Sequence, residues 1–147
     1  MAGTNMFAVK RALFTWLAAA PELAGVQVSY AWPGRSQDRE CIYGGFPEAT
    51  QRYAVMTAGR KPRDEDATIL IRIEVAQPGN DVQAADQRVE ELGAVLETLL
   101  ADNVTLGGLV TGVRYGGITA VESEYVPLDG SIESTATYHV TFSSRLF

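Results

Sequence analysis

The chain has 147 residues, of which 46% are hydrophobic and 20% are charged. A chain of this length can bury about two-thirds of the surface it exposes when unfolded, so it needs neither a disulfide nor a structural metal to fold. A formal charge of −6 and a sequence pI of about 4.7 argue against a DNA-gripping protein, because an acidic surface repels phosphates.

The first predicted element is an amphipathic helix over residues 5–20. Thr4 or Asn5 can cap its start, and Pro21 marks its end. Basic residues, a short apolar run and three alanines imitate a signal peptide, but the helical spacing favours a helix of the folded domain. The run is also too short to span a bilayer. Its apolar stripe comprises Val9, Ala12, Leu13, Trp16, Leu17 and Ala20.

Extended segments follow this helix. Within residues 26–31, Val26, Val28 and Tyr30 alternate with Gln27, Ser29 and Ala31, which predicts a first strand. Turn residues at 32–34 end it, and a charged loop follows over 35–40. A second extended segment begins at 41–43, is interrupted by glycine and proline, and resumes over 51–58.

The middle of the chain predicts a loop, a central strand and a long helix. Residues 59–66 are the most hydrophilic and are predicted to be a loop. Residues 67–76 are predicted to form a central strand, with Ile69, Ile71, Ile73 and Val75 on one face. Asn80 and Gln83 are spaced as a capping box, which predicts a helix from there to about 102.

This second helix repeats its apolar residues at steps of three and four. Gly93 lies inside it, where glycine costs about 1 kcal/mol relative to alanine. We expect close packing against the sheet to explain this glycine. The apolar face consists of Val82, Ala85, Val89, Leu92, Leu96 and Leu99.

The C-terminal part is predicted to be strands. Residues 109–121 read as a strand that Gly116-Gly117 interrupts with a bulge or kink. Residues 122–128 are extended but contain a proline, which places them at an edge or in a loop. Asp129-Gly130 supplies a turn. Residues 135–147 alternate almost perfectly, so this last strand is tied into the sheet with one face in the core.

These elements define the expected fold class as α+β, with a mostly antiparallel β-sheet and two α-helices packed on one face. No internal repeat, low-complexity tract or linker divides the chain. Residues 1–147 are therefore predicted to form a single domain.

The sequence offers little for catalysis, and we predict no catalytic, cofactor-binding or metal-binding residues. His139 is the sole imidazole and Cys41 the sole thiol, so a nucleophilic pair needs two distant strands to meet. We expect Cys41 to be a buried thiol in a reducing compartment. Residues 64–66 are consecutive acids whose carboxylates diverge, as in a solvated acidic run. No phosphate-binding motif precedes the second helix, and no pair of carboxylates stands out for sugar hydrolysis.

Two charged loops remain as candidate interaction sites, over 32–40 and 60–66. They are either solvated hairpin tips or contacts between neighbouring subunits, where charges of mixed sign set orientation. Tryptophan and arginine are enriched at binding hot spots. By loop position and charge, the candidate interface residues are Trp32, Arg35, Arg39, Arg60, Lys61, Arg63, Asp64 and Glu65.

Short strings occur in a characteristic order along nearly the whole chain. They are 17–23 (LAAAPEL), 25–34 (GVQVSYAWPG), 59–65 (GRKPRDE), 78–79 (PG), 106–108 (LGG) and 145–146 (RL). In this order the sequence resembles the tail terminator, or tail completion, proteins of long-tailed bacteriophages, particularly those of actinobacterial hosts. The pattern contains no catalytic signature.

The resemblance implies a structural, non-enzymatic subunit of a hexameric ring that caps the head-proximal end of the tail tube. Its partners would be further copies of itself, the major tail tube protein and the head-completion, or connector, protein. DNA would pass through the lumen as cargo, where an acidic wall lets it slide. The implied location is the tail–neck junction of the virion, and the host cytoplasm during assembly, with no cofactor and no membrane partner.

Two alternatives stay open. Helices on one face of a curved antiparallel sheet can enclose a pocket, so a small-molecule-binding or enzymatic domain is the first. Tyr30, Tyr53, Tyr115 and Tyr138 are the candidate lining of such a pocket, although a closed core is the simpler expectation. The second is another neck component, such as a head-closure protein, which only its position in the particle distinguishes.

Overall fold

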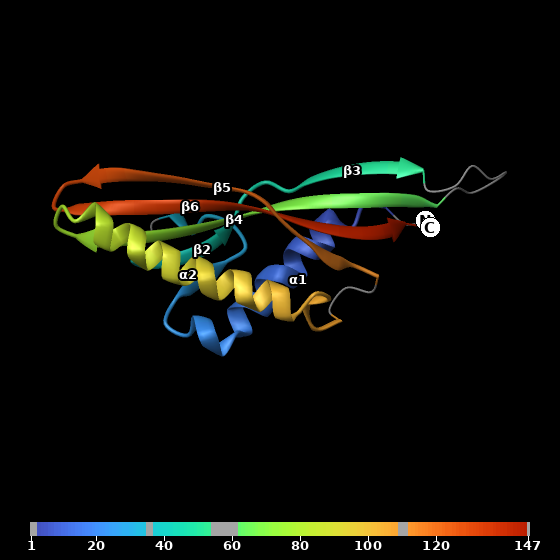
Figure 1. Ribbon diagram of the computed structural model, residues 1–147, viewed down its shortest axis with the longest axis horizontal. Coiled ribbons are helices and arrows are strands. Elements are labelled where there is room, and N and C mark those ends of the chain that lie inside the picture. Colours follow the sequence, from blue (N-terminus) through green and yellow to red (C-terminus); the bar gives the residue numbers. More distant parts are fainter. Residues whose placement is uncertain (1–2, 35–36, 54–61, 109–111, 147) are drawn as a thin grey trace.

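The computed structural model describes residues 3–34, 37–53, 62–108 and 112–146. Within them the chain forms two α-helices and a six-stranded, mostly antiparallel sheet, which confirms the predicted α+β class (Figure 1). The helices are α1 (Met6–Ala19) and α2 (Val82–Asp102), and short 3-10 turns are η1 (Pro21–Leu23) and η3 (Leu106–Gly108). The strands are β1 (Gln27–Ser29), β2 (Glu40–Gly44), β3 (Glu48–Tyr53), β4 (Arg63–Pro78), β5 (Arg114–Leu128) and β6 (Ser131–Leu146).

Strand β4 is the centre of the sheet. The strand order is β1-β2-β4-β6-β5, and β6 pairs with β4 along the full length of both strands. The other side of β4 is shared, because β3 pairs with Arg63–Thr68 and β2 with Ile71–Val75. All described pairs are antiparallel except β1 with β2.

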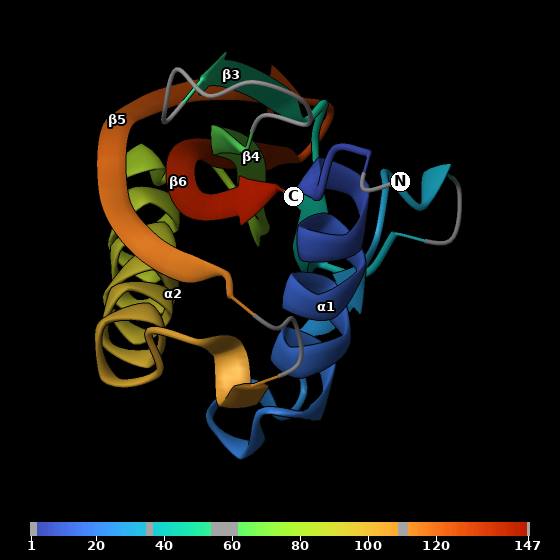
Figure 2. The ribbon, with the colours of Figure 1, turned by 90° about the vertical axis from the view of Figure 1, so that its right-hand side faces the viewer.

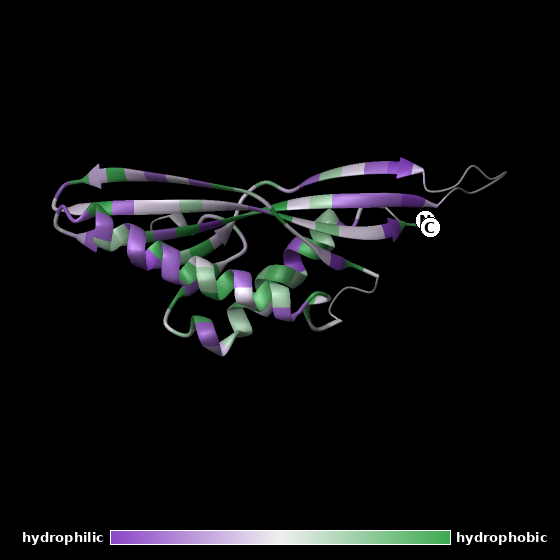
Figure 3. Ribbon diagram, viewed as in Figure 1, coloured by the Kyte–Doolittle hydropathy of each residue, from purple (hydrophilic) through white to green (hydrophobic). Residues whose placement is uncertain are grey.

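Both α-helices cover one face of this sheet (Figure 1), and β5 curves past α2 (Figure 2). The alternation in β4 decides which face is covered, because Ile69, Ile71 and Ile73 all point to the helices and have no exposed surface. Each such side chain contributes about 1.5–3 kcal/mol when it is fully buried. Leu13 of α1 and Leu96 of α2 belong to the same core cluster. Hydrophilic residues lie at the end of β3, at the start of β4 and along α2 (Figure 3).

The prediction of a hydrophilic loop over 59–66 is wrong for residues 63–66. These residues begin β4, because β3 and β6 pair with them from both sides and satisfy their backbone groups. Residues 59–61 lie outside the described residues. The segment predicted over 51–58 is observed as β3, Glu48–Tyr53, and its residues 54–58 also lie outside the described part.

The second helix begins differently from the prediction. Asp81, and not Asn80, is its N-cap, since the Ala84 backbone N–H donates to Asp81 Oδ1 at 3.0 Å. The end of the helix at Asp102 agrees with the prediction. The expected close packing at Gly93 is confirmed, because a Cβ there would lie 2.0 Å from the hydroxyl oxygen of Tyr138 in β6.

The predicted segments 109–121 and 122–128 join into one strand, β5, from Arg114 onward. Its register against β6 shifts between Tyr115 and Gly117 and again between Ile118 and Ala120, which confirms the predicted irregularity. Residues 109–111 lie outside the described residues. The edge position expected for the proline is also confirmed, because β5 is the outermost strand.

Candidate functional site

The predicted interface residues fall into two separate groups. Arg35, Arg60 and Lys61 lie outside the described residues. Trp32 and Arg39 are exposed in the connection between β1 and β2. The remaining residues, Arg63, Asp64 and Glu65, begin β4.

The structure does not bring the two groups together within one subunit. The first group lies near Glu74, because Gln37 of the same connection donates to the Glu74 carboxylate. Glu74 and Glu65 are nine residues apart on β4, or about 30 Å at about 3.3 Å per residue.

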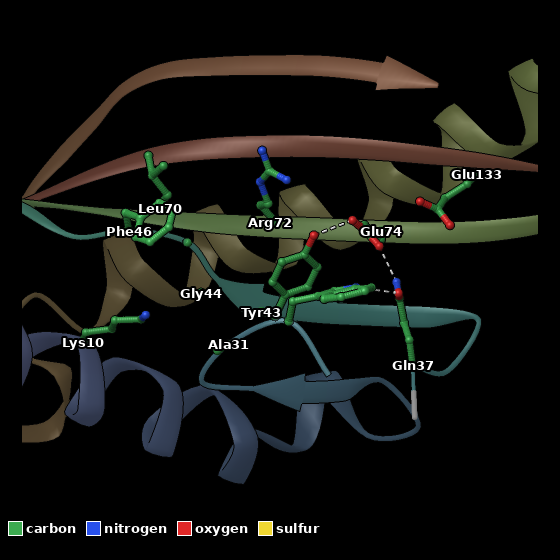
Figure 4. Close-up of a pocket in the computed structure, with 12 residues that line it drawn as sticks. Lys10, Ala31, Gln37, Tyr43, Gly44, Phe46, Leu70, Arg72, Glu74 and Glu133 are labelled. Atoms are coloured by element: carbon green, nitrogen blue, oxygen red, sulfur yellow. Dashed lines mark hydrogen bonds between the residues drawn. The ribbon is translucent and has the colours of Figure 1, made fainter. Parts of the chain in front are cut away.

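Trp32 of the first group borders a pocket of about 740 Å³, which also includes Leu70, Arg72 and Glu74 on the outer face of the sheet. Figure 4 shows these side chains together with the other residues that line the pocket. Two strongly exposed aromatic residues also line it, Trp32 with 65% and Phe46 with 87% of the residue surface exposed. The pocket therefore combines apolar walls with a charged floor.

A chain of hydrogen bonds holds the floor of the pocket. Trp32 Nε1 donates to Gln37 Oε1 at 3.1 Å, Gln37 Nε2 donates to Glu74 Oε2, and the Tyr43 hydroxyl donates to Glu74 Oε1. Glu74 is only 7% exposed. Each of its oxygens accepts a bond from the protein, so the carboxylate forms a fixed part of the wall.

Burial sets the charge states around this floor. Burial raises the pKa of the Tyr43 hydroxyl to about 12, and the hydrogen bond to Glu74 adds to the effect. Burial likewise raises the pKa of the Cys41 thiol to about 11, with Glu74 and Asp38 contributing. Cys41 is therefore a buried, protonated thiol at neutral pH, as predicted, and a poor nucleophile.

The imagined pairing of Cys41 with His139 does not occur. Cys41 lies opposite Glu74 in the sheet, whereas His139 lies opposite Leu70, four residues away along β4. His139 Nε2 instead contacts Glu122 Oε1 of β5 at 2.8 Å. The histidine thus belongs to a cross-strand contact on the outer face.

Glu133 of β6 is the second carboxylate of the pocket. Burial raises its pKa, and the nearby Glu74 carboxylate raises it further. Since the folded pKa lies above the ordinary value of 4.5, ionised Glu133 disfavours folding at neutral pH. This destabilisation of the folded state decreases as the pH falls through the raised pKa. It is absent well below pH 4.5, where the carboxyl group is protonated in both the folded and the unfolded state.

Glu133→Gln is therefore expected to raise the melting temperature at pH 7 and to leave it unchanged at about pH 3.5. Thermal melts of both proteins across this range measure the difference. Glu90→Gln, on the exposed side of α2, is the matched control. A Glu133→Gln protein that is less stable than wild type at pH 7 would contradict the expectation.

The four tyrosines predicted to line a pocket do not line this one. Tyr115 and Tyr138 pack against the core on the helix side, and Tyr53 is 64% exposed at the end of β3. Tyr30 lies under the Lys10 ammonium, 4.1 Å from the ring centre to Nζ. Tyr43 is the lining tyrosine. The sequence carries a partial signal for it, because Cys41 and Tyr43 alternate with the core residue Ile42.

The second group lies at the start of β4, which together with β3 and the end of β6 we call the arm. Two ion pairs connect its strands, with Arg52 Nη1 2.8 Å from Asp66 Oδ2 and Arg145 Nε 2.8 Å from Asp64 Oδ1. Both are partly exposed, so they contribute little stability but favour the observed register.

Glu65 corrects the expectation of a solvated acidic run. It has no exposed surface, because its side chain points to the helix side of the sheet and meets the start of α1. The neighbouring Asp64 and Asp66 point to the outer face, where they form the two ion pairs. Alternation along a strand thus separates one buried carboxylate from two solvated ones.

No protein-family model matches this sequence, and no curated protein matches it significantly. In the described part of the chain, no helix has both the length and the apolar character needed to cross a membrane. The described residues also include no group of three His, Cys, Asp or Glu side chains that could hold a metal ion.

Proposed function

We propose that this protein is a tail terminator, a structural subunit that forms a ring on the head-proximal end of a phage tail tube. The ring stops polymerisation of the tube protein and presents a surface to the head-completion complex. The proposal rests on the resemblance of the short strings and on one geometric observation, the separation of two interaction groups along one sheet.

That separation suits a ring. Identical subunits close into a ring through heterologous contacts, in which two different surfaces of each subunit meet. One group contains the exposed Trp32 and Arg39, and the other contains the ion-paired arm about 30 Å away. Each subunit therefore offers two distinct charged surfaces, and not a single self-complementary one.

The charge of the subunit supports the same function. Each copy carries a formal charge of −6, so a ring of copies would surround its lumen with acidic protein. DNA phosphates would be repelled from such a wall and could pass without binding. The ring would act at the tail–neck junction of the virion after assembly in the host cytoplasm.

The deciding experiment mixes the purified protein with polymerising tail tube protein and measures tube lengths by negative-stain electron microscopy. We expect shorter tubes with a ring at one end only. Arg39→Glu should reduce capping at least tenfold, whereas Arg11→Glu, an exposed arginine on α1, should cap like wild type. A strictly monomeric protein that leaves tube growth unchanged would contradict the proposal.

The pocket on the outer face favours a second candidate, a small-molecule-binding domain. Its volume of about 740 Å³ falls in the range of ligand sites, and aromatic residues form part of its wall. Trp32 and Trp16 are the two tryptophans of the chain, and Trp32 lines the pocket. A ligand that raises the melting temperature and changes the fluorescence of a Trp16→Phe protein, but not that of a Trp32→Phe protein, would favour this candidate.

A head-closure protein is the remaining alternative, and the arguments from ring formation and from acidic charge apply to it equally. Labelling of intact particles distinguishes them, because a terminator lies on the tube and a head-closure protein lies on the connector.

A further inference from the structure

Strand β5 leaves one edge of the sheet unpaired in the described part of the chain. It spans Arg114–Leu128 and pairs only with β6. Every residue from Thr119 to Leu128 is exposed. Four large apolar residues lie in this stretch, with 44–57% of their surface exposed: Val121, Tyr125, Val126 and Leu128.

Apart from Pro127 near its end and the acidic Glu122 and Glu124, the second half of this edge lacks the devices that keep sheet edges apart. Natural edges are short, bulged or guarded by lysines, because an open row of backbone N–H and C=O groups pairs with other chains. Residues 115–128 contain no lysine or arginine. The two register shifts lie before Ala120, and the pairing from Ala120 to Leu128 is regular. The second half of β5 is therefore a ready template for another strand.

On the other side of β4, where β1 ends the main strand order, β3 forms a separate edge that supplies a matching strand. All residues of β3, Glu48–Tyr53, are exposed, and β3 pairs only with β4 among the described strands. β5 runs parallel to β4, because each is antiparallel to β6, whereas β3 runs antiparallel to β4. When copies lie side by side in the same orientation, β3 of one copy and β5 of the next run antiparallel to each other. Antiparallel pairing is slightly more stable per residue than parallel pairing.

We propose that β3 of one copy adds to the Ala120–Leu128 edge of β5 in the next copy, so that the sheets join into one continuous wall. The inference rests on the proposed ring and adds a contact between the arm of one copy and β5 of the next, a surface separate from the Trp32 and Arg39 group. β3 lies level with the end of β6, and Ala120–Leu128 lies level with its start. Joining the two edges therefore tilts the strands against the ring axis, as closure of any barrel requires.

Charge disfavours the competing contact of two β5 edges. The free half of β5 carries Glu122 and Glu124 and no basic residue. Two such edges would place acidic residues against each other, which destabilises cross-strand pairs. β3 carries one basic residue, Arg52, whose side chain is 59% exposed and pairs with Asp66 of its own subunit, and one acidic residue, Glu48. The acidic edge of β5 therefore repels β3 less than it repels a second β5 edge.

The test compares Glu122→Lys/Glu124→Lys with Glu90→Lys/Glu97→Lys, which makes the same charge change on exposed positions of α2. Mass measurement by light scattering should show rings for wild type and for the α2 variant. The β5 variant should need at least tenfold more protein to form rings. Circular dichroism and thermal melts establish that each variant is folded.

Two further measurements locate the contact. Amide hydrogens of 48–53 and of 120–126 and 128 that point away from β4 or β6 should exchange at least tenfold more slowly in the ring than in dilute monomer. Thr50→Cys should form an intersubunit disulfide when combined with one of Glu122→Cys, Glu124→Cys or Val126→Cys, because directly opposed residues place their Cβ atoms close enough. Dimers cross-linked through β5 alone would overturn the pairing.

The outcomes separate this inference from the proposed function. Rings that form normally in the β5 variant, with unprotected amides in 120–128, overturn the edge contact while the ring function stands. A wild-type protein that stays monomeric and leaves tail tubes unchanged overturns both.

Discussion

Glu65→Ala is expected to lower the free energy of unfolding by about 3 kcal/mol, because it removes a buried, charged acceptor. The Thr4 hydroxyl donates to Glu65 Oε2 at 2.6 Å, and the Asn5 backbone N–H donates to Oε1 at 2.7 Å. Gln51 of β3 donates to Oε2 at 2.7 Å. Alanine would leave these donors without their acceptor. Glu65 has no exposed surface, so water cannot replace the lost carboxylate at this position.

The carboxylate also takes the place of a local helix cap. Asn5 is the N-cap of α1, but its side chain makes no capping bond and donates instead to Ser144 Oγ at 3.3 Å. Glu65, from β4, accepts the Asn5 backbone N–H and lies at the positive end of the helix dipole. Glu65→Gln keeps the size of the side chain and one acceptor oxygen but loses the charge. Its free energy of unfolding should therefore lie between those of the wild type and of Glu65→Ala.

Asp66→Ala is the control for this prediction. Asp66 is the next residue on the same strand, and its ion pair with Arg52 is substantially exposed on both sides. Its removal should cost less than about 1 kcal/mol. Urea unfolding followed by circular dichroism measures both changes. Equal losses for Glu65→Ala and Asp66→Ala would show that the carboxylate does not hold the arm to α1.

Gly93→Ala is expected to destabilise the protein by about 2 kcal/mol, although alanine favours a helix by about 1 kcal/mol. The new Cβ would lie 2.0 Å from the Tyr138 hydroxyl oxygen and 3.0 Å from its Cζ. Tyr138 is buried in β6, so it can move only by disturbing the packing between α2 and the sheet. Thermal and urea unfolding measure the loss.

A second substitution tests the cause of this loss. Tyr138→Phe removes the nearest atom, so Gly93→Ala should be less damaging in the Tyr138→Phe background, with a remainder from the contact with Cζ. Ala94→Gly, on the exposed neighbouring position, should show the ordinary helix preference and cost about 1 kcal/mol. Additive effects of Gly93→Ala and Tyr138→Phe would rule out the steric explanation.

These two contacts hold the helices to the sheet and leave other surfaces for partners. The Glu65 carboxylate is engaged within the subunit, whereas Asp64 and Arg63 are partly exposed on the arm. On the other group, Trp32 keeps most of its surface exposed beside the pocket. The proposed ring and the proposed edge contact therefore use side chains and backbone that remain exposed on the surface of the subunit.

Much of the fold could be predicted from local patterns. The alternation of Ile69, Ile71 and Ile73 marked the central strand, and the helical spacing before Pro21 marked α1. The bulge in β5 followed from adjacent glycines, and the buried thiol followed from a lone cysteine in a strand. Each of these depends on neighbours within a few residues, which the sequence records directly.

The candidate site could not be predicted in the same way. A run of three acids looks equally solvated in sequence, and only the pairing of β4 with β3 and β6 buries Glu65 between two exposed aspartates. Tyr43 meets Gln37 and Glu74 only because strands from different parts of the chain lie side by side. Such contacts depend on register between distant segments, and a shift of one residue would reverse every face.

The sequence by itself determined the class of the fold, the positions of both helices and the apolar face of the two long strands, because side-chain periodicity is a local property. The tertiary structure alone decided which carboxylate is buried, which tyrosine faces the pocket and which strands are left at the edges of the sheet. Strand order is set by the packing of the whole chain around one core, and no single segment encodes it.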